Sequence, residues 1–404
     1  MNPFSPGEIA RRQEKARVLM QSAGVDGILV NSYASMYYLS GAPIHQFGRP
    51  AALLLTADGD AVFVCSILER RHIELQSPVQ AMLTYTDHNL DNSYENPVAP
   101  PASFARLVAS AVEEHGLTGS RIGYEDNEMP AGRLAMLQQG LPSVEFAGMS
   151  DPIDRLRMVL SDEELALLRA ADAIADAGEF ALLKNLRPGS TNDELVEICR
   201  RAMLDVVERE HPDKPYMFQV NTGLRAEDQY AGHCDWTFRG PGVLAEKGRL
   251  YFNYFSAFLW GYWGNVERTV ALGKPDDAMM RELEVLSEAN EAAIAAVKPG
   301  EPLADVDRAA KAVLERHGYE RSSIGTGMGR GLVSWEGNAR HLPMDVRLYS
   351  RTIMEPGMVF SIEPFVGAIA PVRRTYLNAN TIIVTDHGAE VDSRVPRGVL
   401  WVDA

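Results

Sequence analysis

The sequence has few cysteines and lacks any long hydrophobic run. Only three of its 404 residues are cysteine, and Cys65, Cys199 and Cys234 are scattered without a CxxC spacing. This pattern argues against a disulfide framework and is typical of a reducing compartment. No apolar run reaches the roughly 18 residues that a transmembrane helix needs. Residues 1–19 are polar and lack the apolar core of a signal peptide, so we expect a cytoplasmic protein.

Positively charged side chains are fewer than negatively charged ones. The chain has 39 Lys and Arg residues against 55 Asp and Glu residues, a formal net charge of −16. Such an acidic chain argues against nucleic acid or an anionic membrane as the main partner. A hydrophobic content of 46% with 23% charged residues is typical of a globular protein. A chain of 404 residues is too long for one ordinary core, so we expect two domains.

The first part of the chain alternates predicted helices and strands. Residues 5–24 have helical periodicity, with a Ser-Pro start and a Gly stop. Residues 26–32 form a predicted buried strand, and residues 50–65 two strands around an Asp-Gly turn. A helix at 102–117 and a strand at 121–126 follow. This order predicts an α/β domain over residues 1–154.

The second part, residues 155–404, contains longer helices and several strands. Ser161, with Glu164 at the capping-box position, predicts the start of the first long helix. The pattern of long helix, Pro-Gly turn and second helix occurs twice, with the turns at 188–189 and 299–300, and it predicts two pseudo-equivalent halves. The predicted strands lie at 249–256, 260–272, 358–366 and 380–385. The expected fold class is therefore α+β.

Four positions interrupt these apolar patterns: His233, Glu267, Glu363 and the Phe47-Gly48-Arg49 triplet. A carboxylate inside an apolar strand is costly unless it is paired, exposed or functional. A structural ion pair or an exposed edge strand would explain Glu267, and an ordinary loop histidine or surface arginine would explain His233 or Arg49. The aromatic run at 251–263 is explained either by core packing or by a ring-lined pocket for a soft cation.

Several motifs together resemble the pita-bread family, which includes creatinase, prolidase, aminopeptidase P and methionine aminopeptidase. These are "NSYASMYYLSG" at 31–41, "FGRP" at 47–50, "NVERTV" at 265–270 and "MEPGMVFSIEP" at 354–364. In length and in the "FGRP" motif the chain is similar to the creatinase-like members. The resemblance implies a C-terminal pita-bread fold with pseudo-twofold halves, a smaller creatinase N-like domain and a homodimer.

The peptidases of this family use a dinuclear metal centre held by two Asp, one His and two Glu. The corresponding positions in this chain hold one carboxylate. They are Asn253, Asn265, Thr326 or Met328, Glu363, and a position near Asn378. Neutral amides do not neutralise two divalent cations, and Met or Thr does not replace imidazole. The expected site therefore contains no metal and no cofactor.

In creatinase-like enzymes a histidine and two glutamates act without metal, and the resemblance implies that His233, Glu267 and Glu363 have these roles. Two converging carboxylates repel unless a cation lies between them or one is protonated, and a cationic substrate group would satisfy both. His233 has the intrinsic pKa suited to proton transfer. The resemblance further implies that Phe47 and Arg49 bind the substrate across the dimer interface, with Arg340 as a second clamp. Tyr262 and Trp263, from the aromatic run, are the remaining substrate-binding candidates.

The implied activity is hydrolysis of a non-peptide C–N bond in a small zwitterion, with creatine as the type substrate. Residues 234–242 and 325–341 depart from the creatinase pattern, and the second segment lacks its two histidines. Four alternatives stay open: ring opening of a cyclic amidine such as ectoine, lyase chemistry on a betaine or sulfonium acid, a metal-dependent Xaa-Pro peptidase, and a non-catalytic binding module.

Overall fold

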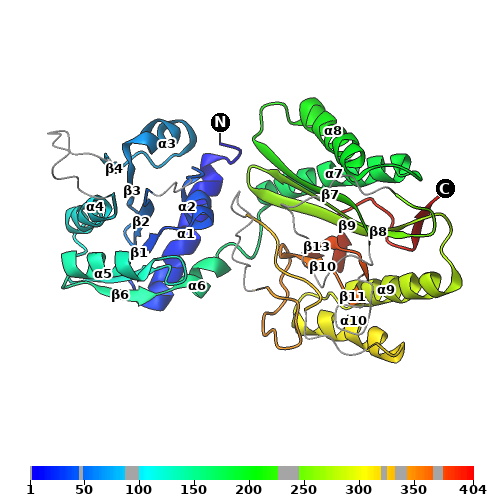
Figure 1. Cartoon of the computed structure of the whole chain (residues 1–404). Coiled ribbons are helices and arrows are strands. Elements are labelled where there is room, and N and C mark those ends of the chain that lie inside the picture. Colours follow the sequence, from blue (N-terminus) through cyan, green and yellow to red (C-terminus); the bar gives the residue numbers. More distant parts are fainter. Residues whose placement is uncertain are drawn as a thin grey trace. The chain divides into compact units, whose positions relative to one another are not determined.

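The computed structural model describes residues 2–44, 49–86, 100–225, 245–319, 325–332, 344–366 and 376–404. The chain divides into two compact units, Met1–Arg157 and Met158–Ala404 (Figure 1). The division falls after Arg157 rather than after the expected residue 154. Arg157 and Asp154 form a buried ion pair of 2.5 Å within this last turn. None of the helices in the described ranges is long and apolar enough to cross a membrane.

The first unit is built on a six-stranded sheet with the order β4-β3-β2-β1-β5-β6. The strands are β1 (Gly27–Val30), β2 (Ala52–Thr56), β3 (Ala61–Ser66), β4 (Met82–Tyr85), β5 (Arg121–Tyr124) and β6 (Glu145–Gly148). β2 pairs antiparallel with both β1 and β3, whereas the outer pairs are parallel. The Asp-Gly turn between β2 and β3 is confirmed, with Gly59 at a φ of 103° that glycine adopts without steric cost.

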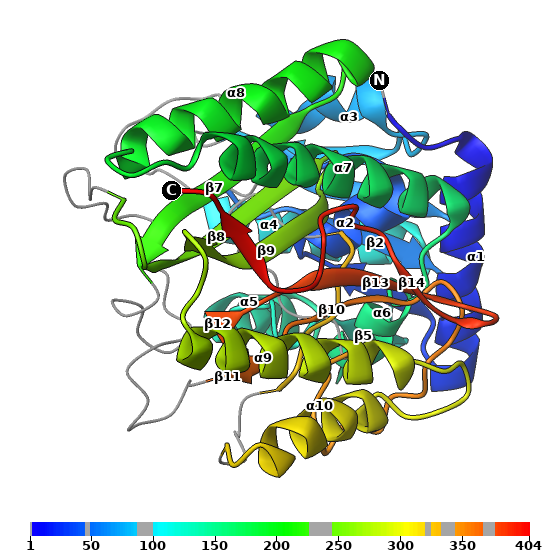
Figure 2. The ribbon, with the colours of Figure 1, turned by 90° about the vertical axis from the view of Figure 1, so that its right-hand side faces the viewer.

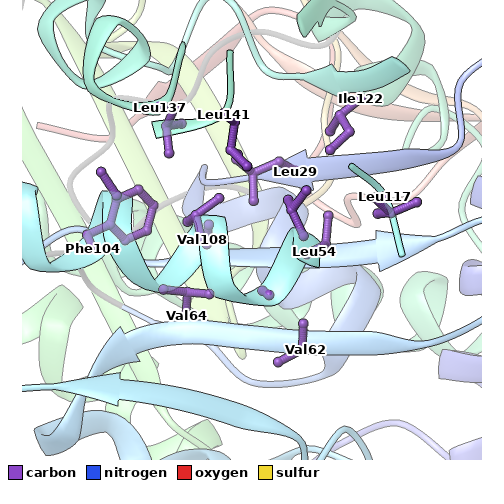
Figure 3. Packing of buried hydrophobic residues seen from close by; sticks show 14 of the residues in the cluster. Leu29, Leu54, Val62, Val64, Phe104, Val108, Leu117, Ile122, Leu137 and Leu141 are labelled. Carbon is purple, nitrogen blue, oxygen red and sulfur yellow. The ribbon is translucent and has the colours of Figure 1, made fainter. Parts of the chain in front are cut away.

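Helices cover this sheet and bury its apolar side chains. They are α1 (Pro6–Ala23), α2 (Tyr33–Ser40), α3 (Arg70–Gln76), α4 (Pro100–Glu114), α5 (Ala131–Gly140) and α6 (Ser150–Arg155). The expected caps of the first helix are confirmed: the Ser5 side chain accepts from the Glu8 N–H, and Gly24 ends α1 in the left-handed conformation. Figure 3 shows Phe104 and Val108 of α4 packed against Leu54 and Val64 of the sheet.

The second unit contains two helix pairs, each with a Pro-Gly turn between its members. They are α7 (Asp162–Asn185) with α8 (Asn192–Glu210), and α9 (Asp277–Ala295) with α10 (Ala304–Arg316). The capping box of Ser161 and Glu164 is present, and Thr191 with Glu194 forms a second one. Figure 2 shows the α7/α8 pair on one side of the strands and the α9/α10 pair on the other.

The strands of the second unit form a larger and two smaller sheets. The larger has the order β15-β9-β8-β7, made of β7 (Tyr216–Arg225), β8 (Leu250–Leu259), β9 (Tyr262–Leu272) and β15 (Leu400–Val402). The others contain β10 (Val359–Ile362) with β13 (Asn380–Thr385) and β14 (Gly388–Val391), and β11 (Phe365–Val366) with β12 (Tyr376–Leu377). The single strand expected at 358–366 is wrong: it breaks at Glu363-Pro364, where proline has no N–H to donate to a ladder.

The β8–β9 hairpin determines which side chains can meet. Its two-residue turn places Trp260 and Gly261 at φ values of 51° and 78°, the positive values that a type I′ turn requires. The register pairs Tyr254 with Glu267 and Ser256 with Asn265, so these four share one face. The opposite face packs on α7. A Cβ at Gly264 would lie only 2.3 Å from the backbone nitrogen of Asp172, so this close approach requires glycine.

Candidate active site

The structure brings Glu267 and Glu363 together in the interior of the second unit. Glu267 lies in β9, and Glu363 directly follows β10; both side chains are buried. The Glu363 backbone N–H donates to the Thr326 carbonyl at 2.7 Å, which fixes the chain just before Pro364. Burial and the adjacent Glu363 carboxylate raise the pKa of Glu267 to about 8. Burial also raises the pKa of Glu363, against the opposing charge of Arg330.

Arg330 is a member of this site that the sequence reasoning missed. It lies in the segment 325–332, where its backbone N–H donates to the Val359 carbonyl at 2.8 Å, and Gly331 accepts from the Trp263 N–H at 3.3 Å. These bonds place the Arg330 guanidinium carbon 3.7 Å from the centre of the Trp263 ring. Its Nη2 lies 3.8 Å from Oε2 of Glu363. One signal in the sequence could have identified Arg330: it is a charged residue between two glycines, in the segment where related peptidases carry a histidine.

Hydrogen bonds orient the aromatic side chains on this face. The Trp263 indole N–H donates to the Ser256 hydroxyl at 2.6 Å, and that hydroxyl donates to Tyr254 at 2.6 Å. The Tyr254 hydroxyl donates to Gln219 at 3.3 Å. Phe258 stacks on Trp263 with 5.9 Å between ring centroids. The Trp263 ring is therefore held in place beneath Arg330, and it is half-buried.

The aromatic side chains of the run lie on both faces of the hairpin, and the two predicted substrate-binding residues Tyr262 and Trp263 lie on opposite faces. Trp263 lies on the face of Glu267. Tyr262 lies on the α7 face, where its buried hydroxyl donates to Glu164 at 2.7 Å. Asn253 also lies on the α7 face, so the assignment of Asn253 to a metal-ligand position is wrong. The error is an offset of one residue. Successive side chains of a strand point to opposite faces, so the neighbouring Tyr254 points to the site instead.

The remaining predicted residues lie elsewhere or outside the described ranges. Arg49 belongs to the first unit and is half-buried. Burial raises the pKa of Glu69, and the charges of His72 and Arg49 oppose that rise. His233, Phe47 and Arg340 lie outside the described residues, so their predicted roles stay predictions.

The positions that hold metal in the related peptidases make ordinary protein contacts here. Asn265 donates to Oε1 of Glu267 at 2.8 Å, and Thr326 donates to Asp307 at 2.5 Å. The Asn378 side chain accepts from the Thr269 N–H at 3.0 Å. Across the described ranges no group of three or more His, Cys, Asp or Glu side chains is placed to hold a metal ion. A guanidinium and two carboxylates do not match a dinuclear metal site, whose ligands must be deprotonated donors.

A second group of buried charges lies on the α7 face of the hairpin. Arg268 is fully buried and donates to five acceptors, namely the carbonyls of Glu267, Ala379, Val395 and Pro396 and the side chain of Asn380. Asp176 accepts from Ser393 and from the Arg394 N–H, each at 2.6 Å. Burial raises the pKa of Glu179 to about 8, and Arg268 opposes that rise.

Two family models match the chain. Metallopeptidase family M24 matches residues 166–389, and the Creatinase/Prolidase N-terminal domain matches residues 12–159. A creatinase of a Bacillus species is 25% identical, covering 98% of this chain and 92% of its own. An ectoine hydrolase of Halomonas elongata is 25% identical, with 98% and 97% covered. The probable dipeptidase PepE of Mycobacterium tuberculosis is 27% identical, with 99% and 98% covered.

The fold agrees with solved structures over nearly the whole chain. The crystal structure of dipeptidase PepE from Mycobacterium ulcerans matches with a TM-score of 0.80 at 24% identity, covering 99% of this chain and all of that one. The expected pita-bread fold and creatinase N-like domain are thereby confirmed. The chain belongs to metallopeptidase family M24, as a hydrolase with the creatinase/prolidase N-terminal domain.

Proposed function

We propose that the protein is a metal-independent hydrolase of a non-peptide C–N bond in a small zwitterionic substrate. The observation that carries this proposal is the buried pair Glu267 and Glu363, whose charges interact where the family's peptidases bind metal. The neighbouring positions offer amide, hydroxyl and guanidinium groups in place of metal ligands. The creatinase relative supports the reaction class.

The protonation state of the two glutamates supports recognition of a cation. With a pKa of about 8, Glu267 carries a proton at neutral pH, while Arg330 lies beside Glu363. A substrate ammonium or guanidinium group can replace that proton and donate hydrogen bonds to both carboxylates. Once it has lost this proton, Glu267 binds the cationic group of the substrate together with Glu363.

The proposed reaction adds water across the C–N bond. The water oxygen bonds to the substrate carbon, the C–N bond breaks, and the leaving nitrogen takes a proton. For creatine the products are sarcosine and urea. We assign the proton transfer to His233, and the hold on the substrate carboxylate to Arg340 and to Phe47 and Arg49 of a partner subunit in a homodimer. These assignments derive from the family resemblance.

A substrate screen tests this function. Purified protein is incubated with creatine, other guanidino acids, ectoine and betaines, and products are read by urea, ammonia and mass. We expect a guanidino acid to gain water and split, and Glu267→Gln and Glu363→Gln to bind it more weakly. No turnover of any guanidino acid, together with turnover of Xaa-Pro dipeptides, would overturn the proposal.

Ring opening of a cyclic amidine is a second candidate. The ectoine hydrolase and creatinase relatives are each 25% identical to this chain, with similar coverage, so sequence similarity does not separate the two. The same screen does: ring opening adds the mass of one water and releases neither urea nor ammonia. Lyase action on a betaine or sulfonium acid would instead split the substrate without adding water.

A further inference from the structure

Among the described residues, Arg330 is buried with most of its hydrogen-bond donors unused. Its side chain is only 1% exposed. Within the described residues, Nε and Nη1 have no hydrogen-bond acceptor. Nη2 approaches Glu363 at 3.8 Å, beyond hydrogen-bond distance. Since Nε carries one N–H and Nη1 carries two, at least three donors of this guanidinium await an acceptor.

Such an arrangement is unusual for a buried arginine. A buried guanidinium is normally surrounded by carboxylates or carbonyls, because unmet donors keep the full cost of their desolvation. The Trp263 face, 3.7 Å from the guanidinium carbon, stabilises the positive charge but accepts none of the in-plane N–H bonds. The N–H groups of Nε and Nη1 therefore have no acceptor among the described residues. They point to different sides of the guanidinium, and each can donate a charge-assisted hydrogen bond to a carboxylate oxygen.

The charges around Arg330 favour an anion that arrives with its own cation. Arg330 balances Glu363, and Glu267 is protonated at neutral pH because its pKa lies at about 8. The group thus has no net charge before substrate binds. A zwitterion adds no net charge to this group. A ligand with only a negative charge would be repelled by Glu363, and a ligand with only a positive charge would be repelled by Arg330.

We propose that Arg330 binds the carboxylate of the substrate while Glu363 and Glu267 bind its cationic group, an inference that rests on the proposed function. Arg330 is then a specificity-determining residue that works alongside the clamps expected from the family. The Trp263 ring supports the Arg330 guanidinium from one side, and the hydrogen bond from Trp263 to Ser256 fixes the ring.

This arrangement limits the spacing of the substrate charges. Arg330 and Glu363 are neighbours, with 3.8 Å between Nη2 and Oε2. A substrate that contacts both must carry its carboxylate and its cation close together, as in creatine or a betaine with one methylene between the charges. Homologues with two or three methylenes between the charges bind more weakly.

Calorimetric titration of the full chain tests the inference without requiring turnover. The probes are creatine, then 3-guanidinopropionate and 4-guanidinobutyrate, which place two and three methylenes between the charges, and methylguanidine, which keeps the cation but lacks the carboxylate. We expect the wild type to bind creatine at least about tenfold more tightly than methylguanidine, a difference of about one decade in Kd. Arg330→Gln should lose this preference while its methylguanidine affinity holds or rises, because Glu363 then loses its internal cation.

Three controls make the result decisive. Arg330→Lys keeps the positive charge but loses the planar set of guanidinium donors, so its creatine affinity should lie between those of Arg330→Gln and the wild type. Arg347→Gln removes an arginine that lies over Tyr349 but is 40% exposed, and it should bind as the wild type does. The melting temperature of each variant reports whether it folds. Equal affinities of wild type for creatine and methylguanidine, or an Arg330→Gln variant with an unchanged creatine preference, would overturn the inference.

The outcomes also separate this inference from the proposed function. If the carboxylate preference depends on Arg330 but no C–N bond is hydrolysed, the carboxylate site stands and the proposed reaction falls. If creatine is hydrolysed with the same KM in Arg330→Gln and the wild type, the reaction stands and the role of Arg330 falls.

Discussion

Arg268 and Arg330 are both fully buried beside strand β9, on opposite faces of the same hairpin, yet their surroundings differ. Arg268 donates to five acceptors on the α7 face. Arg330 has an aromatic ring, one carboxylate at 3.8 Å, and free donors on Nε and Nη1 within the described residues. The protein itself satisfies the Arg268 guanidinium, whereas Arg330 lacks acceptors among the described residues, and we propose that a ligand supplies them.

The comparison extends to the glutamates of the two faces. Glu179 and Glu267 both have a pKa raised to about 8 by burial. Glu179 lies inside α7 against Arg268, where it belongs to the packing between helix and sheet. Glu267 faces a second glutamate and an arginine with unused donors. A raised pKa therefore does not by itself identify a catalytic group, and the partners on each face make the distinction.

The largest expected difference between the faces is in stability. Arg268→Met removes five hydrogen bonds and leaves buried acids without their cation, so we expect it to lower the free energy of unfolding by about 3–5 kcal/mol. Arg330→Met should cost less, about 1–2 kcal/mol, because it removes donors that are unmet among the described residues, and Glu363, whose pKa burial already raises, can take up a proton when the guanidinium is gone. Denaturant unfolding of both variants measures the difference. Equal losses would contradict the assignment of Arg268 to the fold and Arg330 to the ligand.

The next difference is in catalysis. Glu267→Gln should lower kcat/KM by at least about 100-fold, because the cationic group of the substrate loses one of its two carboxylates. Glu179→Gln, an identical substitution on the α7 face, should leave kcat/KM within about threefold of the wild type, since it touches no substrate. Steady-state kinetics on the substrate found by the screen compares the two, with circular dichroism to verify folding. A larger loss of activity in Glu179→Gln than in Glu267→Gln would contradict the assignment of the active site to the Glu267 face.

A smaller difference concerns the pH dependence of stability. The pKa of Glu179 is about 8 in the folded chain against an ordinary value of 4.5, so the folded state binds the extra proton between these pH values. Stability from this group is complete below pH 4.5 and is lost as the pH rises through 8, by at most about 1.4 kcal/mol per pH unit. Glu179→Gln removes this loss.

Thermal unfolding of the wild type and Glu179→Gln at pH 5 and pH 8 measures this effect. The stability of the variant relative to the wild type should be higher at pH 8 than at pH 5. A constant difference between the two pH values would show that Glu179 keeps an ordinary pKa.

The smallest expected effects come from the adjacent residues Tyr262 and Trp263. Tyr262→Phe loses the hydrogen bond to Glu164 and should cost about 1 kcal/mol of stability without changing KM. Trp263→Phe keeps a ring beneath Arg330 but loses the bond to Ser256, and it should raise KM. Kinetics and unfolding of both variants test this division. A raised KM for Tyr262→Phe would support its predicted role in substrate binding.

Local patterns in the sequence predicted most of the second unit's elements. The capping box at Ser161 and the strand at 380–385 lie where they were expected, because caps and alternation are local properties. The break after β10 was missed, although Pro364 signalled it. Asn253 was placed on the wrong face because an offset of one residue in a strand reverses the direction of the side chain.

Arg330 shows what such patterns leave out. Its significance depends on Trp263, 67 positions earlier in the chain, and on Glu363, 33 positions later, which only the folded chain brings together. Glycines flank it in the sequence, so it does not interrupt an apolar run as Glu267 does. Its unused donors follow from the absence of nearby acceptors among the described residues, and no local spacing encodes that property.

The most direct test of the account is hydrolysis of a guanidino acid by protein freed of metal. Metal content is measured by plasma emission before and after chelation, and product release is followed on the same samples. We predict far less than one metal ion per chain and a kcat that chelation does not change. Two tightly held ions per chain, with activity lost on chelation and restored by divalent metal, would contradict the central claim.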